Sequence, residues 1–108
     1  MAFLSCTYLG IEVELSAERE EHIRRHHPDL LPDHRQRIIE TVGEPDQIRR
    51  SARVGNALLF SKWFADLRGG NHVVVVVVSD PGRGIHPWVI TAYLTRRLKE
   101  GEVAWEKS

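Results

Sequence analysis

The spacing of apolar residues changes twice along the chain, and each change marks a different kind of element. In residues 3–15, Ile11, Val13 and Leu15 alternate with glutamates, which is typical of a strand with one face in water. From residue 16 to about residue 45 the apolar residues recur at helical spacing, and after residue 46 the period-two pattern returns. The sequence therefore predicts an N-terminal strand, then helices, then a run of strands.

Two helices are predicted, at residues 17–27 and 33–43. Ser16 is a favourable N-cap for the first helix, and Pro28 ends it because proline disfavours helical geometry in the residue before it. Asp33 is predicted to cap the second helix. The apolar stripe of that second helix consists of Ile38, Ile39 and Val42.

Strands are predicted near residues 56–66, 72–79 and 87–95, with a short candidate at 47–51 and a polar tail at 97–105. Six consecutive valines indicate that the strand at 72–79 is buried on both faces, so it should be central in the sheet. The short connections favour antiparallel hairpins. We expect an α+β fold in which two N-terminal helices pack on one face of an antiparallel sheet of about four strands.

Length and charge limit the possible classes of function. A chain of 108 residues predicts a single domain over residues 1–108. Fifteen Lys and Arg residues balance fifteen Asp and Glu residues, so the formal net charge is zero. Proteins that coat nucleic acid non-specifically are usually basic throughout, and any nucleic-acid site here must therefore be local.

Cysteine content and hydropathy indicate the compartment. Cys6 is the single cysteine, which excludes an internal disulfide and fits a reducing compartment; we expect it to be a packed residue. The apolar run at residues 73–78 is far shorter than the ~20 residues that cross a bilayer. The sequence predicts a cytoplasmic protein without a membrane partner.

Histidines cluster near the end of the first predicted helix. His22 and His26 are four residues apart and share one helix face, with Arg19 one turn earlier, and His27 precedes Pro28. Three interpretations stay open: cations that stabilise a helix end, a zinc site, and general acid–base catalysis. Zinc needs three or four ligands, and neither a cysteine cluster nor a glutamate directly after His22 supports it. We predict no metal ion and no cofactor.

Polar side chains also interrupt the predicted strands. Lys62 lies in an otherwise aromatic strand, where a solvated residue is the simpler interpretation. Thr91, Tyr93 and Thr95 alternate with apolar residues and should share one face. They are either β-prone residues packed across strands or a row of hydroxyl donors that faces a cleft beside the histidines.

Taken together, these segments resemble the phage and bacterial nuclease-fold domains related to barnase, EndoU, tRNA-cleaving colicins and RelE-type toxins. The resemblance covers roughly residues 8–105 and depends on the order and spacing of the motifs. These motifs are His22-Ile23-x-x-x-His27-Pro28, Ile38-Ile39-Glu40-Thr41-Val42, Glu44-Pro45-Asp46-x-Ile48, Leu59-Phe60-x-Lys62, the valine strand and Val89-Ile90-Thr91-Ala92-Tyr93.

The resemblance implies a compact domain with a cleft on the face of its sheet. Active members cleave RNA without a metal ion, by attack of the ribose 2′-hydroxyl on the adjacent phosphate. The matching positions imply four catalytic residues, His22, His27, Lys62 and Thr91. They imply substrate contacts from Arg25, His26, Tyr93, Thr95 and Arg96.

One position departs from the pattern of the family. Relatives tend to read Arg-His-Pro where this chain reads His26-His27-Pro28, so Arg24 or Arg25 would have to supply the displaced charge. The expected function is that of a toxin-like endoribonuclease domain that acts on RNA and is accompanied by a protein inhibitor. The alternative is a catalytically weak or inactive module of the same fold that binds RNA or protein.

Overall fold

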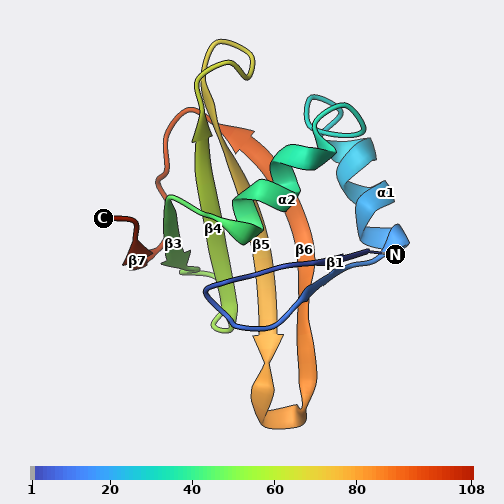
Figure 1. Ribbon diagram of the computed structural model, residues 1–108, viewed down its shortest axis with the longest axis vertical. Helices are drawn as coiled ribbons and strands as arrows, with labels where there is room; N and C mark the ends of the chain where they lie inside the picture. The colour runs from blue at the N-terminus through green and yellow to red at the C-terminus, as the bar shows by residue number, and fades with distance from the viewer. Residues whose placement is uncertain (1) are drawn as a thin grey trace.

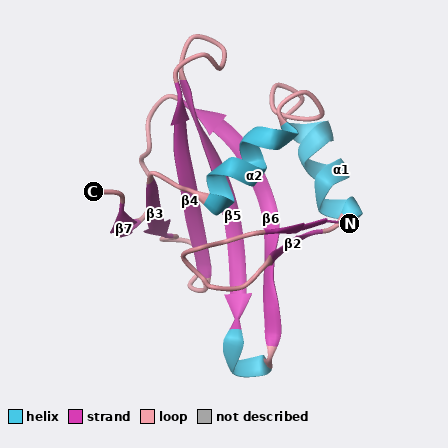
Figure 2. Cartoon of the chain, viewed as in Figure 1, coloured by secondary structure: helices cyan, strands magenta, loops and turns pink. Residues whose placement is uncertain are grey.

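The computed structural model describes residues 2–108 and has an α+β architecture, as the sequence predicts. Figure 1 shows two helices in front of one sheet, and Figure 2 distinguishes the helices and strands from the loops that connect them. The elements are β1 (Ala2–Leu4), β2 (Val13–Leu15), α1 (Ala17–His26), α2 (Arg35–Gly43), β3 (Gln47–Arg50), β4 (Ala57–Phe64), β5 (Asn71–Asp80), a 3₁₀ turn (Pro81–Arg83), β6 (Ile85–Thr95) and β7 (Glu102–Glu106).

The valine strand β5 is central in the sheet, as predicted. It pairs antiparallel with β4 on one side and with β6 on the other. On the side of the helices Val73, Val75 and Val77 are fully buried, whereas Val76 on the other side is partly exposed. The central position therefore removes both edges of the hydrophobic run from water, but only one of its faces completely.

The expected antiparallel sheet of about four strands was wrong. Residues 2–108 form seven strands in the order β1-β2-β6-β5-β4-β3-β7, and the sheet is mixed because β2 runs parallel to β6, with Glu14 opposite Trp88. The single strand expected at residues 3–15 is two strands of three residues joined by a loop. Segments this short show no clear period, and the parallel partner of β2 lies far along the chain, so local pattern could not reveal this arrangement.

The C-terminal segment also differs from its prediction as a polar tail. Residues 102–106 form β7, which pairs antiparallel with β3 at the far edge of the sheet from β6. Residues 96–101 must therefore cross the sheet between the end of β6 and the start of β7 (Figure 1, orange to red). We call these residues the crossing segment.

The two helix starts differ in how they are capped. Ser16 caps α1 as predicted, since its Oγ accepts a hydrogen bond of 3.1 Å from the Arg19 amide. The predicted cap at Asp33 was wrong, because α2 begins at Arg35 with His34 at the cap position and no side-chain cap bond. The His34 amide instead bonds to the Leu30 carbonyl at 2.8 Å, so a preceding turn leads into the helix.

The helices cover one face of the sheet and define its two sides. α1 packs on β6, and α2 packs on β5 and β4. The register places Phe60, Val75 and Ala92 on the covered side, where all three are fully buried. Side chains at the alternate positions point to the opposite side, which we call the open face.

Candidate functional site

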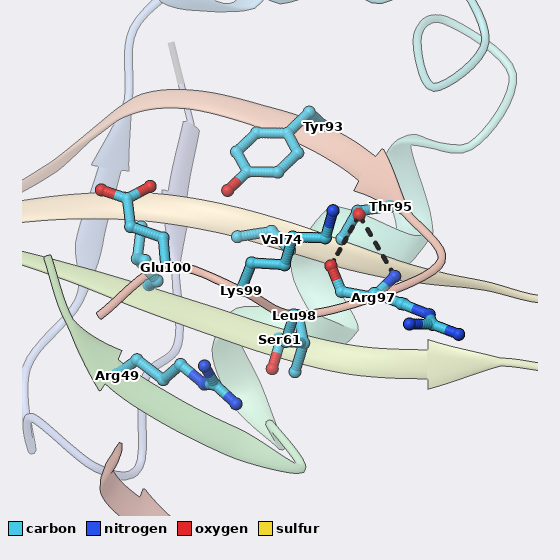
Figure 3. Close-up of a pocket in the computed structure, with 10 residues that line it drawn as sticks. Arg49, Ser61, Val74, Tyr93, Thr95, Arg97, Leu98, Lys99 and Glu100 are labelled. Atoms are coloured by element: carbon cyan, nitrogen blue, oxygen red, sulfur yellow. Dashed lines mark hydrogen bonds between the residues drawn. The ribbon is translucent and has the colours of Figure 1, made fainter. Parts of the chain in front are cut away.

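A pocket of about 160 Å³ lies on the open face, beneath the crossing segment (Figure 3). Its floor consists of side chains that share a face on β4, β5 and β6, and its wall is formed by residues 97–100. The lining residues are Arg49, Leu59, Ser61, Val74, Tyr93, Thr95, Arg97, Leu98, Lys99 and Glu100. Residues far apart in the sequence thus meet around one hollow.

Positive charge is concentrated at this pocket, although the whole chain is neutral. Arg49, Arg97 and Lys99 line it, and among residues 2–108 none of the three is in an ion pair. The lining residues include one carboxylate, Glu100, which accepts a hydrogen bond of 3.1 Å from the Ser51 hydroxyl. Cations without carboxylate partners attract anions, so the pocket fits a phosphate group.

Thr95 fixes the start of the crossing segment. Its Oγ1 donates to the Arg97 carbonyl at 2.8 Å and accepts from the Arg97 amide at 3.3 Å, as the dashed lines in Figure 3 mark. These bonds turn the chain back over the sheet directly after β6. They position Arg97 at the pocket by means of backbone contacts, which leave its guanidinium free to bind a ligand.

Tyr93 is half-buried, and its hydroxyl points toward Glu100 in Figure 3. Burial raises the pKa of the phenol, and the negative charge of Glu100 raises it further, while Arg53 opposes them. The phenol therefore stays protonated at neutral pH and can donate a hydrogen bond to a phosphate oxygen. The ring of His27 lies beside it, with the two ring centroids 6.1 Å apart.

The row of hydroxyl side chains that the alternating pattern of β6 predicts is present, and we call it the hydroxyl row. Thr91, Tyr93 and Thr95 lie opposite Val76, Val74 and His72 of β5, so all three share the open face. Tyr93 and Thr95 line the pocket. The Thr91 hydroxyl is enclosed, and within residues 2–108 it has no hydrogen-bond partner.

Lys62 lies on the other side of the sheet from the hydroxyl row. It pairs with Val73, which belongs to the core beneath the helices. Its ammonium donates to the Glu44 carbonyl at 2.8 Å and lies 3.9 Å from the Asp46 carboxylate. It lines a separate pocket of about 650 Å³ between β1 and α2. The structure therefore does not bring Lys62 and Thr91 to one cleft.

The histidines of α1 are divided between two environments. His27 contacts Tyr93, whereas His22 and His26 stack on each other with centroids 4.3 Å apart. Desolvation lowers the pKa of His22, and the neighbouring charges of His26, Arg19 and His27 lower it further. Of these helix residues, His27 is the one that reaches the pocket face of β6.

The remaining predicted substrate contacts lie outside the pocket lining. Arg25 bonds to Glu21 on the exposed side of α1, at 3.4 Å. Arg96 donates to the Arg68 carbonyl at 3.4 Å, beside the turn between β4 and β5. Arg96 lies next to the pocket residues in sequence, but its bond to Arg68 directs its side chain toward that turn.

Sequence reasoning missed His72, Arg49 and Glu100. His72 lies on the open face of β5, opposite Thr95 and two residues before Val74. Burial lowers the pKa of its imidazole, with a smaller lowering from Arg49 and an opposing effect from Asp46. The alternation of side chains along a strand could have placed His72 on the same face as the hydroxyl row. No pattern in the neighbouring sequence indicates that the crossing segment brings Glu100 to that face.

Residues 2–108 contain no group of three or more His, Cys, Asp or Glu side chains placed to hold a metal ion. Neither helix of that range is long and apolar enough to cross a membrane. Comparison with protein-family models, with curated proteins and with solved structures gave no significant match to this chain.

Proposed function

We propose that this chain is a metal-independent endoribonuclease domain that holds a phosphodiester of RNA in the pocket on the open face. The observation that carries the proposal is that Arg49, Arg97, Lys99 and Tyr93 all line one pocket. Three cations and a neutral hydroxyl donor match the charge and hydrogen-bonding needs of a phosphate. The order of motifs that resembles the barnase, EndoU, colicin and RelE group supports RNA as the substrate.

In the proposed reaction the ribose 2′-oxygen attacks the adjacent phosphorus. The 2′-hydroxyl gives its proton to one imidazole, the new bond to phosphorus forms, and the bond to the 5′-oxygen breaks. A second acid protonates the leaving 5′-oxygen, and the products are a 2′,3′-cyclic phosphate and a 5′-hydroxyl. The nucleophile belongs to the substrate and is already positioned, so no metal-bound water is needed.

We assign one of the two proton transfers to His27 and the other to His72. His27 adjoins Tyr93, and His72 lies opposite Thr95 in register, so the two imidazoles flank the hydroxyl row. Imidazole exchanges protons near neutral pH. Arg97, Lys99 and Tyr93 then stabilise the charge on the transferring phosphoryl group. The catalytic roles predicted from sequence for His22 and Lys62 remain predictions, and His22→Ala and Lys62→Ala in the same cleavage assay test them.

The test is cleavage of a single-stranded RNA by the purified chain in EDTA. We expect a 2′,3′-cyclic product, and no cleavage of a substrate with 2′-methoxy groups. His27→Ala should slow the reaction by ~10²–10⁴-fold, the usual contribution of an acid–base group. His34→Ala is the matched control, because His34 makes no side-chain cap bond at the start of α2. No cleavage, loss of cleavage in EDTA, or full rate in His27→Ala would overturn the proposal.

The second candidate is a module that binds RNA or protein without cleaving it. Two observations favour it. The formal net charge is zero, and Lys62, the lysine that the resemblance makes catalytic, donates to the Glu44 carbonyl. Such a module would bind uncleavable RNA and release no product from a cleavable one. The protein inhibitor that the resemblance implies also remains a prediction.

A further inference from the structure

An exposed tryptophan lies on the open face beside the pocket. Trp63, near the end of β4, is 44% exposed. It pairs with His72 of β5, which pairs in turn with Thr95 of β6, so the three side chains form a row across the sheet. Thr95 lines the pocket. A large aromatic surface is thus separated by a single strand, β5, from a residue of the candidate phosphate site.

The indole is held in place although much of it is exposed. A methyl group on Gly70 would lie 2.8 Å from Cζ2 of Trp63, which shows how closely the backbone approaches one side of the ring. The His72 ring meets it edge-on, with centroids 4.9 Å apart. The Trp63 amide donates to the Asp46 carboxylate at 2.8 Å. A ring fixed in this way loses little freedom when it binds a ligand.

Two arginines, Arg96 and Arg97, lie near the same end of the sheet. The Arg96 guanidinium lies over the turn that packs on Trp63, since its Nη2 is 3.6 Å from the position that a Cβ on Gly69 would take. Arg97 follows directly and lines the pocket. A fixed aromatic ring flanked by cations is the arrangement with which proteins bind unpaired nucleotides.

We propose that Trp63 is a stacking platform for a nucleobase of single-stranded RNA whose phosphate occupies the neighbouring pocket. This proposal rests on the proposed function for the phosphate, and it adds a class of substrate. A base in a duplex already has partners on both faces, whereas an unpaired base can stack on the exposed indole. The site therefore selects single strands over duplexes, without a requirement for a particular base.

The test is binding of a single-stranded RNA in which every 2′-hydroxyl is methylated, so that it cannot be cut. In a variant with Trp88→Phe and Trp105→Phe, Trp63 is the single tryptophan and its fluorescence reports stacking. We expect quenching by the single strand and little by the same sequence in a duplex. In the otherwise native chain, Trp63→Ala should weaken binding by about 5- to 150-fold, the range that loss of one stacked base gives. Trp63→Phe should recover part of the affinity.

Trp105→Ala is the matched control. Trp105 is 38% exposed, but it lies opposite Ile48, a fully buried core residue on the side of the helices. Its removal should leave the affinity unchanged. Unchanged affinity in Trp63→Ala, or equal quenching by duplex and single strand, would overturn the platform.

The two proposals fail separately in this experiment. Binding is measured on an RNA that cannot react. Absence of cleavage in the assay with unmodified RNA therefore contradicts the catalytic assignment without contradicting the stacking of a base on Trp63. Conversely, a chain that cleaves RNA but binds normally without Trp63 contradicts the platform alone. Circular dichroism of each variant separates misfolding from loss of the contact.

Discussion

The rings of His27 and Tyr93 lie 6.1 Å apart, so the end of α1 meets the pocket face of β6. The contact joins the histidine helix to the hydroxyl row that the sequence singles out. Arg19 makes a second link about two turns earlier along α1, where its Nη1 donates to the Ile90 carbonyl at 3.3 Å. α1 therefore lies along the part of β6 that β2 leaves unpaired, and it brings His27 beside Tyr93, which lines the pocket.

The two sides of the sheet should respond differently to loss of a cation. Arg97→Ala removes a pocket charge, and we expect it to reduce the salt dependence of RNA binding by about one unit of slope and to slow cleavage by ~10²–10³-fold. Lys62→Ala should change neither by more than a few-fold, because its ammonium is bound on the covered side. Binding of RNA across a salt series tests this. Equal effects of the two variants would contradict the pocket assignment.

Gly101 should tolerate no side chain, because its backbone and its surroundings both exclude one. Its φ is +84°, and a Cβ would meet the Arg50 carbonyl oxygen across the β3–β7 pairing. Gly10, with φ of +68° and open space around it, is the matched control. We expect Gly10→Ala to cost about 1–2 kcal/mol and Gly101→Ala distinctly more, measured by urea unfolding. Equal costs would show that the carbonyl contact contributes nothing.

Thr91→Val should stabilise the fold. The Thr91 hydroxyl is enclosed, and the part of the chain described offers it no hydrogen bond, so valine of similar shape removes a desolvation penalty. We expect the free energy of unfolding to rise by about 1 kcal/mol. Thr95→Val is the contrasting variant and should destabilise, since its hydroxyl bonds twice to Arg97. A destabilised Thr91→Val would indicate a partner for the hydroxyl in solution.

Acidification should destabilise the chain through His72 and His22. Burial lowers the pKa of each imidazole below its ordinary value of about 6.5, so the unfolded chain takes up these protons first. Their contribution to stability is present above that pH and is lost as the pH falls from about 6.5 through the folded pKa. Unfolding midpoints at about pH 7.5 and 5.5 test this. The drop should be smaller in His72→Gln and His22→Gln, and an unchanged drop in both variants would contradict it.

Ile23 should be the main apolar attachment of α1. It is fully buried, and it is the buried residue of that helix. Ile23→Ala should cost about 2–5 kcal/mol, as expected for a buried aliphatic side chain. Ile11→Ala, at a side chain that is 52% exposed, should stay within about 0.5 kcal/mol. Thermal unfolding of both variants gives the comparison, and similar losses would argue against a core beneath α1.

The sequence by itself determined the elements whose pattern is local. Helical spacing and the Ser16 cap predict α1, and the valine run predicts a central strand because only such a position buries both faces. Period two also determined that Thr91, Tyr93 and Thr95 share a face. These features depend on residues a few positions apart, so a single sequence contains them.

Tertiary structure alone decided which faces meet. Whether Lys62 and Thr91 share a side of the sheet depends on the register of two strand pairs, and a shift of one residue would reverse the answer. The parallel contact of β2 with β6 and the pairing of β7 with β3 join segments far apart in the chain. The pocket depends on that last pairing, because it draws residues 96–101 across the open face and brings Arg97, Lys99 and Glu100 to Tyr93. Contacts of this kind are selected by burial over the whole fold, and no local spacing along the sequence specifies them.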